Sequence, residues 1–208
     1  MNNIQDDETR EKSKERRKQV IDAAAKCFRK GGFHGSSIAR ISKVAGMSPG
    51  HIYYHFANKE AIVEALVAQQ ESSLMELVND IACADPDEAL VTTLTRHTQR
   101  MVDCHITPEF VGLRLEIAAE SARNPAVAKI LHQSHKAISR RLDEQLIARV
   151  KIDNQDDMQR LRAKMDVIAT IFNGLSLYSL LWSEEDKADK SLLVDTINGV
   201  IVNLIKDQ

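Results

Sequence analysis

The side chains best suited to chemistry at a surface lie close together between Ser48 and Lys59. Within this segment, residues 50–55 contain a glycine, two tyrosines and two histidines. Hydroxyl and imidazole groups can bond to phosphate oxygens and base edges, and a glycine lets the backbone approach a ligand closely. No carboxylate stands near Ser48 and these histidines to orient them for nucleophilic catalysis. The segment therefore predicts a binding surface and not a catalytic centre.

Two short helices and a tight turn must position this segment. Ser37 is a favoured N-cap for the first helix, which Gly46 ends. Ser48 and Pro49 are the start signal of a second helix, expected over 49–55. The apolar residues of the first helix repeat at i, i+3 and i+6, on nearly one face: Ile38, Ile41 and Val44.

The second helix should present most of its side chains to solvent. At about 100° per residue, taking Ile52 as the inward direction predicts that Phe56 also points inward. The outer face then carries the groups that could enter a groove of duplex DNA, which are Gly50, His51, Tyr53 and Tyr54. Lys59 opens the next helix and is a candidate phosphate contact at a positive helix end.

A longer set of residues follows a fixed order along this part of the chain. It comprises Gly32-Phe33, Ser37, Ile41, Ala45-Gly46-Met47-Ser48, Pro49-Gly50, Ile52-Tyr53-Tyr54-His55-Phe56 and Lys59-Glu60. This order closely resembles the N-terminal DNA-binding domain of TetR family transcriptional regulators, over about 60 residues. The sequence departs from the family at His51, where threonine is common, and at Ser42, where alanine is common.

The resemblance implies an all-α fold in three parts. These are a flexible N-terminal arm over 1–13, a DNA-binding domain over 14–74 with its helix-turn-helix at 37–56, and a ligand-binding and dimerisation domain over 75–208. It also implies a regulator, usually a repressor, that binds a palindromic operator as a homodimer and is released by a small-molecule effector. No cofactor and no enzymatic activity are expected. The implied DNA-binding residues are Ser37, Arg40, Ser48, Pro49, Gly50, His51, Tyr53, Tyr54, His55 and Lys59.

The charge of the chain is unevenly distributed. Residues 1–59 hold 12 Lys and Arg against 6 Asp and Glu, a net +6, whereas residues 60–208 hold 16 against 24, a net −8. The first part can attract a polyanion while the second repels one. No apolar stretch is long enough for a signal peptide or a membrane span, so we expect a cytoplasmic location.

Hydrophobic periodicity predicts helices for nearly all of the chain and no strands of useful length. The first helix is expected over 13–30, and the three-helix unit should centre on Phe28, Ile41, Val44, Met47, Ile52 and Phe56. One continuous rod is expected from 58 to 81, ending before Asp85-Pro86. Later helices are expected over 87–105, 108–124, 126–151, 158–182 and 190–205, the last with Leu193, Ile197, Val200 and Leu204 inward.

The segment 158–182 is apolar almost all round from Met165 onward. Such a helix is buried on two sides. In the resemblance, the last two long helices pair with their copies to form a four-helix dimer interface. A buried hairpin within one chain would show the same pattern.

Polar or aromatic residues inside apolar faces are candidates for a ligand pocket. They are His97, Met101, Phe110, Arg114, Phe172, Tyr178 and Trp182. Each of them could equally be an ordinary core or surface residue. Arg114, if inward, needs a ligand anion or a partner such as Glu116 or Glu120.

Other chemistries have weaker support. Cys27 is expected in the core, while Cys83 or Cys104 could sense oxidation. His132 and His135 could share a metal with another histidine, but no spacing fixes a third ligand, so no metal is predicted. The chain lacks the phosphate-binding and nucleophile motifs of common enzymes. A DNA-binding architectural or adaptor protein without an effector stays open as an alternative.

Overall fold

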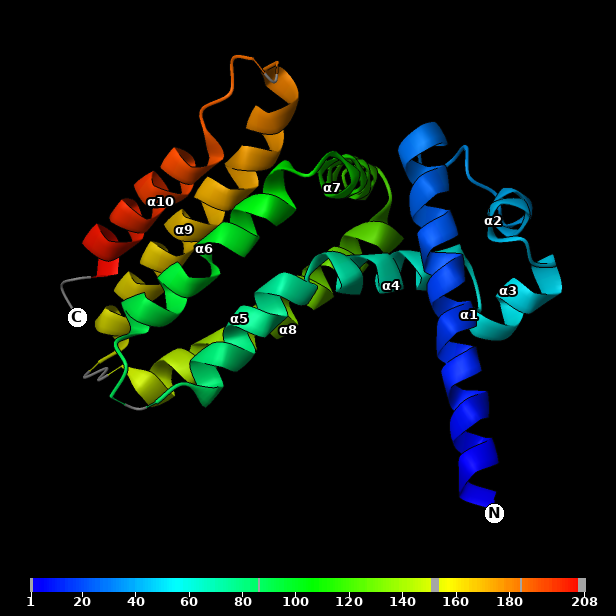
Figure 1. Ribbon diagram of the computed structural model, residues 1–208, viewed down its shortest axis with the longest axis horizontal. Helices are drawn as coiled ribbons and strands as arrows, with labels where there is room; N and C mark the ends of the chain where they lie inside the picture. Colours follow the sequence, from blue (N-terminus) through cyan, green and yellow to red (C-terminus); the bar gives the residue numbers. More distant parts are fainter. Residues whose placement is uncertain (1, 86, 151–153, 184, 206–208) are drawn as a thin grey trace. The chain divides into compact units, whose positions relative to one another are not determined.

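The computed structural model describes residues 2–85, 87–150, 154–183 and 185–205, and all regular structure in these ranges is helical (Figure 1). This confirms the all-α prediction. Met1, Pro86 and Lys151, on which parts of the sequence predictions fall, lie outside the described residues. The helices are α1 Asn2–Gly31, α2 Ile38–Ala45, α3 Pro49–His55, α4 Lys59–Gln70, α5 Ser72–Cys83, α6 Leu90–Ile106, α7 Pro108–Ser121, α8 Pro125–Arg149, α9 Gln155–Leu181 and α10 Lys190–Ile205.

The helices form two compact units. The first contains the described residues up to Gln70 together with Gly112–Gln133, and the second contains Glu71–Val111 with the chain from Ser134 onward. The end of α7 and the beginning of α8 therefore belong to the unit that holds α1 to α4. We call these two parts the reader unit and the helical unit.

The core of the reader unit is built from every helix in it. Phe28 of α1, Ile41 of α2 and Ile52 of α3 are almost fully buried, and α7 adds Leu113 and Ile117 to the same cluster. The sequence prediction for Val44 is wrong, because 49% of this residue is exposed. Helix α2 turns Ile41, Ser42 and Ala45 inward, and at about 100° per residue that direction leaves Val44 far to one side.

Helix α1 extends further toward the amino terminus than the sequence analysis predicts. It begins at Asn2, so residues 2–13, expected as a flexible arm, are helical. This stretch and the next turn are rich in Glu, Lys, Arg and Gln, which favour helix. Pairs three residues apart add support, with Lys14 Nζ 2.6 Å from Glu11 Oε1 and Arg16 Nη1 3.1 Å from Gln19 Oε1.

The rod expected from 58 to 81 is also interrupted. Helix α4 ends at Gln70, Glu71 forms a turn, and α5 begins at Ser72. Two successive serines, which favour helix less than Ala, Leu or Glu, follow this break. Ser73 is buried, and its Oγ lies 3.2 Å from the Sγ of Cys104 on α6.

The helical unit packs α6 against α5, α9 and α10 around a second apolar cluster. On α10 the buried residues are Val194, Ile197, Ile201 and Ile205. Of the predicted inward set, Ile197 is buried, and Leu193 and Leu204 are half-buried against the same cluster. Val200, predicted inward, is 37% exposed. The error arises because α10 is apolar on more than one face, which leaves periodicity unable to identify the buried one. Among the described residues, no helix has the length and apolar character needed to span a membrane.

Candidate DNA-binding surface

The turn between α2 and α3 has the predicted local structure. The Ser37 hydroxyl accepts a hydrogen bond from the Arg40 amide at 3.2 Å, and Ser48 accepts one from the His51 amide at the same distance. Gly46 ends α2 with φ of 64°, a conformation that residues with a side chain rarely adopt. Pro49 occupies the first turn of α3. Local side-chain caps therefore set both the start of α2 and the start of α3.

Helix α3 presents nearly all of its side chains outward. Ile52 is its only buried residue, and Phe56, the C-cap, is 3% exposed. Tyr53 and Tyr54 are 55% and 78% exposed. Gly50 and His51 are exposed as well. The orientation predicted from Ile52 is therefore confirmed, and α3 offers its polar groups to a partner.

His55, at the end of α3, differs from the other candidates because it is half-buried. Burial lowers the pKa of its imidazole, and the nearby positive charges of His51 and Arg17 lower it further. Its ring packs edge-on against Tyr54 with centroids 5.0 Å apart. His55 is consequently held toward the neutral form, in which it can donate or accept a hydrogen bond.

Lys59, at the start of α4, has a structural contact that the sequence analysis missed. Its Nζ donates to the main-chain oxygen of Phe33 at 2.5 Å and lies 3.7 Å from the centroid of the Phe33 ring. Burial lowers the pKa of this amine, against the opposing effect of Glu60 and Glu120. A phosphate contact by Lys59 stays a prediction, and such a contact would compete with the Phe33 carbonyl for the same ammonium group.

The loop between α1 and α2 depends on two glycines. Gly32 has φ of 67°. At Gly35 an added Cβ would lie 2.1 Å from the main-chain oxygen of Gly31, so no larger residue fits there. Arg40, one of the predicted DNA-binding residues, donates from Nη1 to Gly35 O at 3.1 Å and remains exposed. The loop is thus closed by local contacts.

Two carboxylates of α7 contact this loop, whereas the sequence suggested them only as partners for Arg114. Glu116 Oε1 accepts a hydrogen bond from the Phe33 amide at 2.8 Å. Glu120 is 1% exposed and lies 3.2 Å from His34 Nε2. The i, i+4 spacing of the two glutamates indicated that they share one face of a helix. No nearby residue in the sequence indicated that this face contacts the loop before α2.

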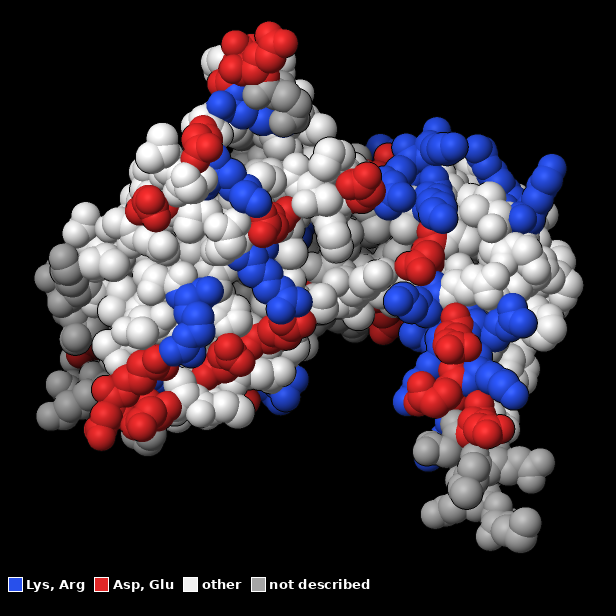
Figure 2. Space-filling model, in the orientation of Figure 1, with Lys and Arg blue, Asp and Glu red and all other residues white. Residues whose placement is uncertain are grey.

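Positive charge gathers on the reader unit. On the face drawn in Figure 2, Lys and Arg side chains cluster over α1 and α2, while the helical unit carries many of the Asp and Glu side chains. The exposed cations of these two helices are Arg10, Lys12, Lys14, Arg16, Arg17, Lys18, Lys26, Arg29, Lys30, Arg40 and Lys43. This placement suits an anionic polymer bound by the reader unit.

The seven ligand-pocket candidates differ in their surroundings. Met101 and Phe172 lie in the same buried cluster, and His97 Nε2 lies 2.7 Å from Asp80 Oδ2. Phe110 and Trp182 are 36% and 52% exposed, and Tyr178 packs on Trp182 with ring centroids 6.0 Å apart. Arg114 is half-buried and belongs to the reader unit. His105, which is not among these candidates, is buried with its ring centroid 5.7 Å from that of Phe172.

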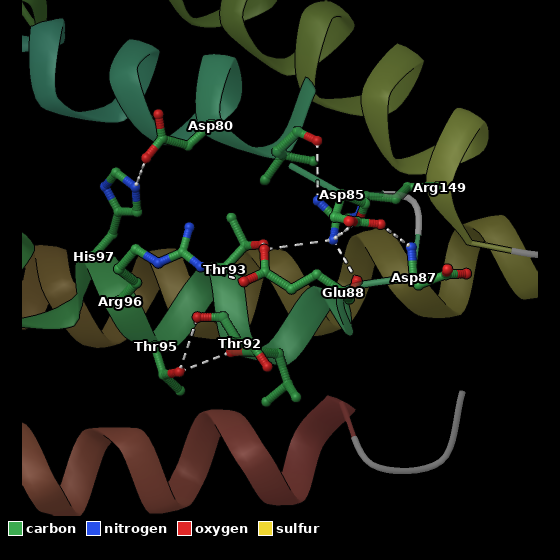
Figure 3. A network of polar contacts seen from close by, with 12 residues as sticks. Asp80, Asp85, Asp87, Glu88, Thr92, Thr93, Thr95, Arg96, His97 and Arg149 are labelled. Carbon is green, nitrogen blue, oxygen red and sulfur yellow. Dashed lines mark hydrogen bonds and ion pairs between the residues drawn. The ribbon is translucent and has the colours of Figure 1, made fainter. Parts of the chain in front are cut away.

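A polar network fixes the loop after α5 in the helical unit (Figure 3). Arg149 of α8 donates to the main-chain oxygens of Ile81 at 3.1 Å and Asp85 at 3.3 Å, and also to that of Glu88. The Glu88 carboxylate accepts from Thr93 Oγ1 at 2.9 Å and from Arg96. The Arg149 side chain is 7% exposed, so its guanidinium ties α8 to the end of α5 from inside the unit.

The remaining cysteines and histidines show no assembled site. Burial raises the pKa of the Cys27 thiol, an effect partly offset by Arg40 and Lys30. His132 and His135 are exposed on α8. In the part of the chain that the structure describes, no three His, Cys, Asp or Glu residues are grouped so as to hold a metal ion.

Comparison with known proteins agrees with this geometry. Residues 20–66 match the profile of a family described as bacterial regulatory proteins, tetR family. The chain is 33% identical over 127 residues to the HTH-type transcriptional regulator UidR of Escherichia coli K12, covering 59% of this chain and 60% of UidR. The HTH-type transcriptional repressor AcnR of Corynebacterium glutamicum is 22% identical over 191 residues, covering 89% of this chain and 92% of AcnR.

Solved structures share the fold. The transcriptional regulator FadR of Bacillus subtilis, solved in complex with stearoyl-CoA, has a TM-score of 0.67 at 20% identity, covering 90% of this chain and 98% of that one. At 20% sequence identity, this structural similarity shows a shared fold and nothing about function. The match to UidR spans 60% of the length of that protein, so it relates part of each chain.

Proposed function

Because the chain belongs to the TetR family of transcriptional regulators, we propose that it is a sequence-specific DNA-binding repressor released from its operator by a small-molecule effector. One observation carries the DNA-binding proposal. Helix α3 buries only Ile52 and exposes its tyrosines, glycine and His51, although a short helix gains little stability without packing. The exposed face of α3 is therefore explained by a binding partner that covers it.

That partner is the major groove of duplex DNA. The groove is about 12 Å wide and admits a single helix. Gly50 lets the first turn of α3 approach closely, while Tyr53, Tyr54 and His51 supply hydroxyl and imidazole groups for base edges and phosphates. Cations of α1 and α2 add phosphate contacts. Ser37, Ser48 and Pro49 act indirectly, since they set the helix starts.

We infer that the protein acts as a homodimer through α9 and α10, which pack against one another. An uncharged, exposed stripe runs along α9 opposite the buried Phe172, and its residues are Ala163, Val167, Thr170, Gly174, Leu177 and Leu181. On α10 the exposed residues Leu192, Thr196, Gly199 and Val200 continue it. An added Cβ at Gly174 or Gly199 meets nothing within 4 Å, so a partner helix can approach there.

A dimer gives the operator its expected form. Two recognition helices on one face of B-DNA bind half-sites about 34 to 36 Å apart, and a two-fold dimer matches a palindrome. An effector that prefers the non-binding shape about 100-fold would supply about 2.7 kcal/mol of coupling, within the usual allosteric range. We place the effector in the helical unit, with His97, Met101 and Phe172 as candidate contacts. FadR, solved with stearoyl-CoA, supports an effector in this fold.

Selection from a random duplex library, followed by footprinting, tests the proposal. We expect one enriched palindrome, protected as a single site, with an affinity that falls steeply as salt is raised because several phosphates are neutralised. Protection of many unrelated sites would favour an architectural protein, and protection of no site would overturn the DNA-binding proposal. A thermal-shift screen of small molecules, followed by release of the selected duplex, tests the effector.

A further inference from the structure

The main chain of Phe33 is held at its N–H and at its carbonyl by charged side chains. Its N–H donates to Glu116 of α7 at 2.8 Å, and its carbonyl accepts from Lys59 of α4 at 2.5 Å. The Phe33 ring lies under the same ammonium, 3.7 Å from Nζ, and packs on Phe28 with centroids 5.7 Å apart. One residue of the loop before α2 thus joins α1, α4 and α7.

The absence of a side chain at Gly32 allows Glu116 to reach the Phe33 amide. The φ of 67° at Gly32 turns the Phe33 amide, and an added Cβ would lie 3.0 Å from Glu116 Oε1. A side chain at this position would therefore meet both backbone strain and the carboxylate. Gly32 thus leaves the space that the Glu116 carboxylate occupies, although the two residues are 84 positions apart in the sequence.

Glu120 repeats the arrangement one turn further along α7. It is 1% exposed, and its oxygens lie 3.2 Å from His34 Nε2, 2.9 Å from Arg123 Nε and 2.9 Å from Asn124 Nδ2. A buried carboxylate is costly unless it is bonded in this way. Consecutive residues of the loop, Phe33 and His34, therefore each contact a glutamate of α7.

The second half of α7 is a packed part of the reader unit. Leu113 and Ile117 are 3% and 5% exposed in the same cluster as Phe28, and Gly112 lies against Arg29, with an added Cβ 3.7 Å from Cδ. The first residues of this helix, up to Val111, belong to the helical unit. From Gly112 onward, α7 therefore holds Glu116 and Glu120 against the loop from within the reader unit.

We propose that Glu116 is a positioning residue for DNA binding. By accepting a hydrogen bond from the Phe33 amide, it sets the path of the loop from Gly32 to Ser37, the cap of α2, and positions the Phe33 carbonyl that Lys59 of α4 contacts. Glu116 itself makes no contact with the DNA. The inference rests on the proposed function and assigns to α7 the contact that orders the loop before α2.

Variants at Glu116 separate this role from simple charge repulsion with DNA. Glu116→Gln keeps an acceptor oxygen, whereas Glu116→Ala removes it and leaves the Phe33 amide without this partner. We expect Glu116→Ala to weaken binding of the selected duplex about tenfold, as expected for loss of one hydrogen bond to a charged group, while Glu116→Gln stays close to wild type. The slope of log K against log salt should not change, because no phosphate contact is lost.

The matched control is Glu64→Ala, which removes an exposed carboxylate of α4 in the same unit. Amide hydrogen exchange supplies a local readout, and the Phe33 amide should exchange faster in Glu116→Ala than in wild type or in the control. Circular dichroism confirms that each variant is folded at the temperature of the assay.

The outcomes distinguish the two proposals. A wild-type chain that selects no duplex overturns the proposed function, and the positioning role with it. A wild type that selects a duplex, together with unchanged affinity of Glu116→Ala, overturns the positioning role alone. Tighter binding by both Glu116→Gln and Glu116→Ala also overturns it, because that result assigns the glutamate a repulsive effect of its charge.

Discussion

The guanidinium of Arg17 on α1 lies 4.7 Å from the centroid of the Phe56 ring, the C-cap of α3. This cation–π contact links the basic segment of α1 to the end of the recognition helix. Phe56 is nearly fully buried, so the contact covers the edge of the core. It also brings a positive charge close to His55, with a consequence for the dependence of stability on pH.

We predict that His55 makes the reader unit less stable in acid. The pKa of His55 is lowered from 6.5 in the folded state, chiefly by burial and then by His51 and Arg17. The unfolded chain therefore binds a proton more readily, and the stability contributed by neutral His55 is present above pH about 6.5 and lost as pH falls through the folded-state pKa.

Denaturant unfolding at a series of pH values between 5 and 8 measures this effect. His55→Gln should show a shallower fall in the free energy of unfolding below pH about 6.5. His135→Gln, which changes an exposed histidine of α8, is the control. Identical pH profiles of wild type and His55→Gln would contradict the prediction.

Tyr54 and Lys59 should respond differently to truncation. Tyr54 is 78% exposed, so Tyr54→Ala should lower affinity for the selected duplex about tenfold, the size of one lost base contact, and leave the melting temperature unchanged. Lys59→Ala removes a cation and its contact with Phe33, so both affinity and melting temperature should fall. Gel-shift titration and thermal melting by circular dichroism measure the pair. A stable Lys59→Ala variant would show that its contact with Phe33 contributes little.

The helix-turn-helix could be predicted closely because its determinants are local. Ser37, Gly46, Ser48 and Pro49 each act within a few residues, through a cap, a left-handed turn or a preset φ. Ile52 then sets the inward direction of α3 by helical geometry alone. Nothing distant in the sequence is needed to orient the exposed tyrosines.

The contacts of Glu116 could not be predicted in the same way. Phe33 lies 83 residues away, and only the packing of α7 on α1 brings the two together. The same reason explains why Lys59 was assigned to phosphate alone. The inward face of α10 was predicted only in part, because this helix is apolar on several faces. Periodicity does not show which of these faces packs in the core of the same chain and which is exposed.

A charge placed on the α9 stripe should separate the proposed dimer. Leu177 is 54% exposed in the carboxyl-terminal half of the stripe, and Leu177→Arg would bury an unpaired cation in the interface at considerable cost. We expect a monomer by light scattering at micromolar concentration, with weakened binding to a palindrome. Asp166→Arg, on the same helix at the side of the stripe, is the control and should remain dimeric. A dimeric Leu177→Arg variant would place the interface elsewhere.

Arg149 should be among the most sensitive positions for the stability of the helical unit. Its side chain is 7% exposed and donates to three main-chain oxygens, those of Ile81, Asp85 and Glu88. Arg149→Ala removes all three hydrogen bonds of a nearly buried guanidinium and should lower the free energy of unfolding by about 3 kcal/mol. Arg149→Lys should recover little of this stability, because a single ammonium cannot reproduce the planar guanidinium with its several donors.

The control is Arg140→Ala, at a side chain that is 79% exposed and paired with Glu144, which should lower the free energy of unfolding by less than about 1 kcal/mol. Urea unfolding followed by circular dichroism measures all three, and equal losses at Arg149 and Arg140 would show that the network in Figure 3 does not hold the end of α5.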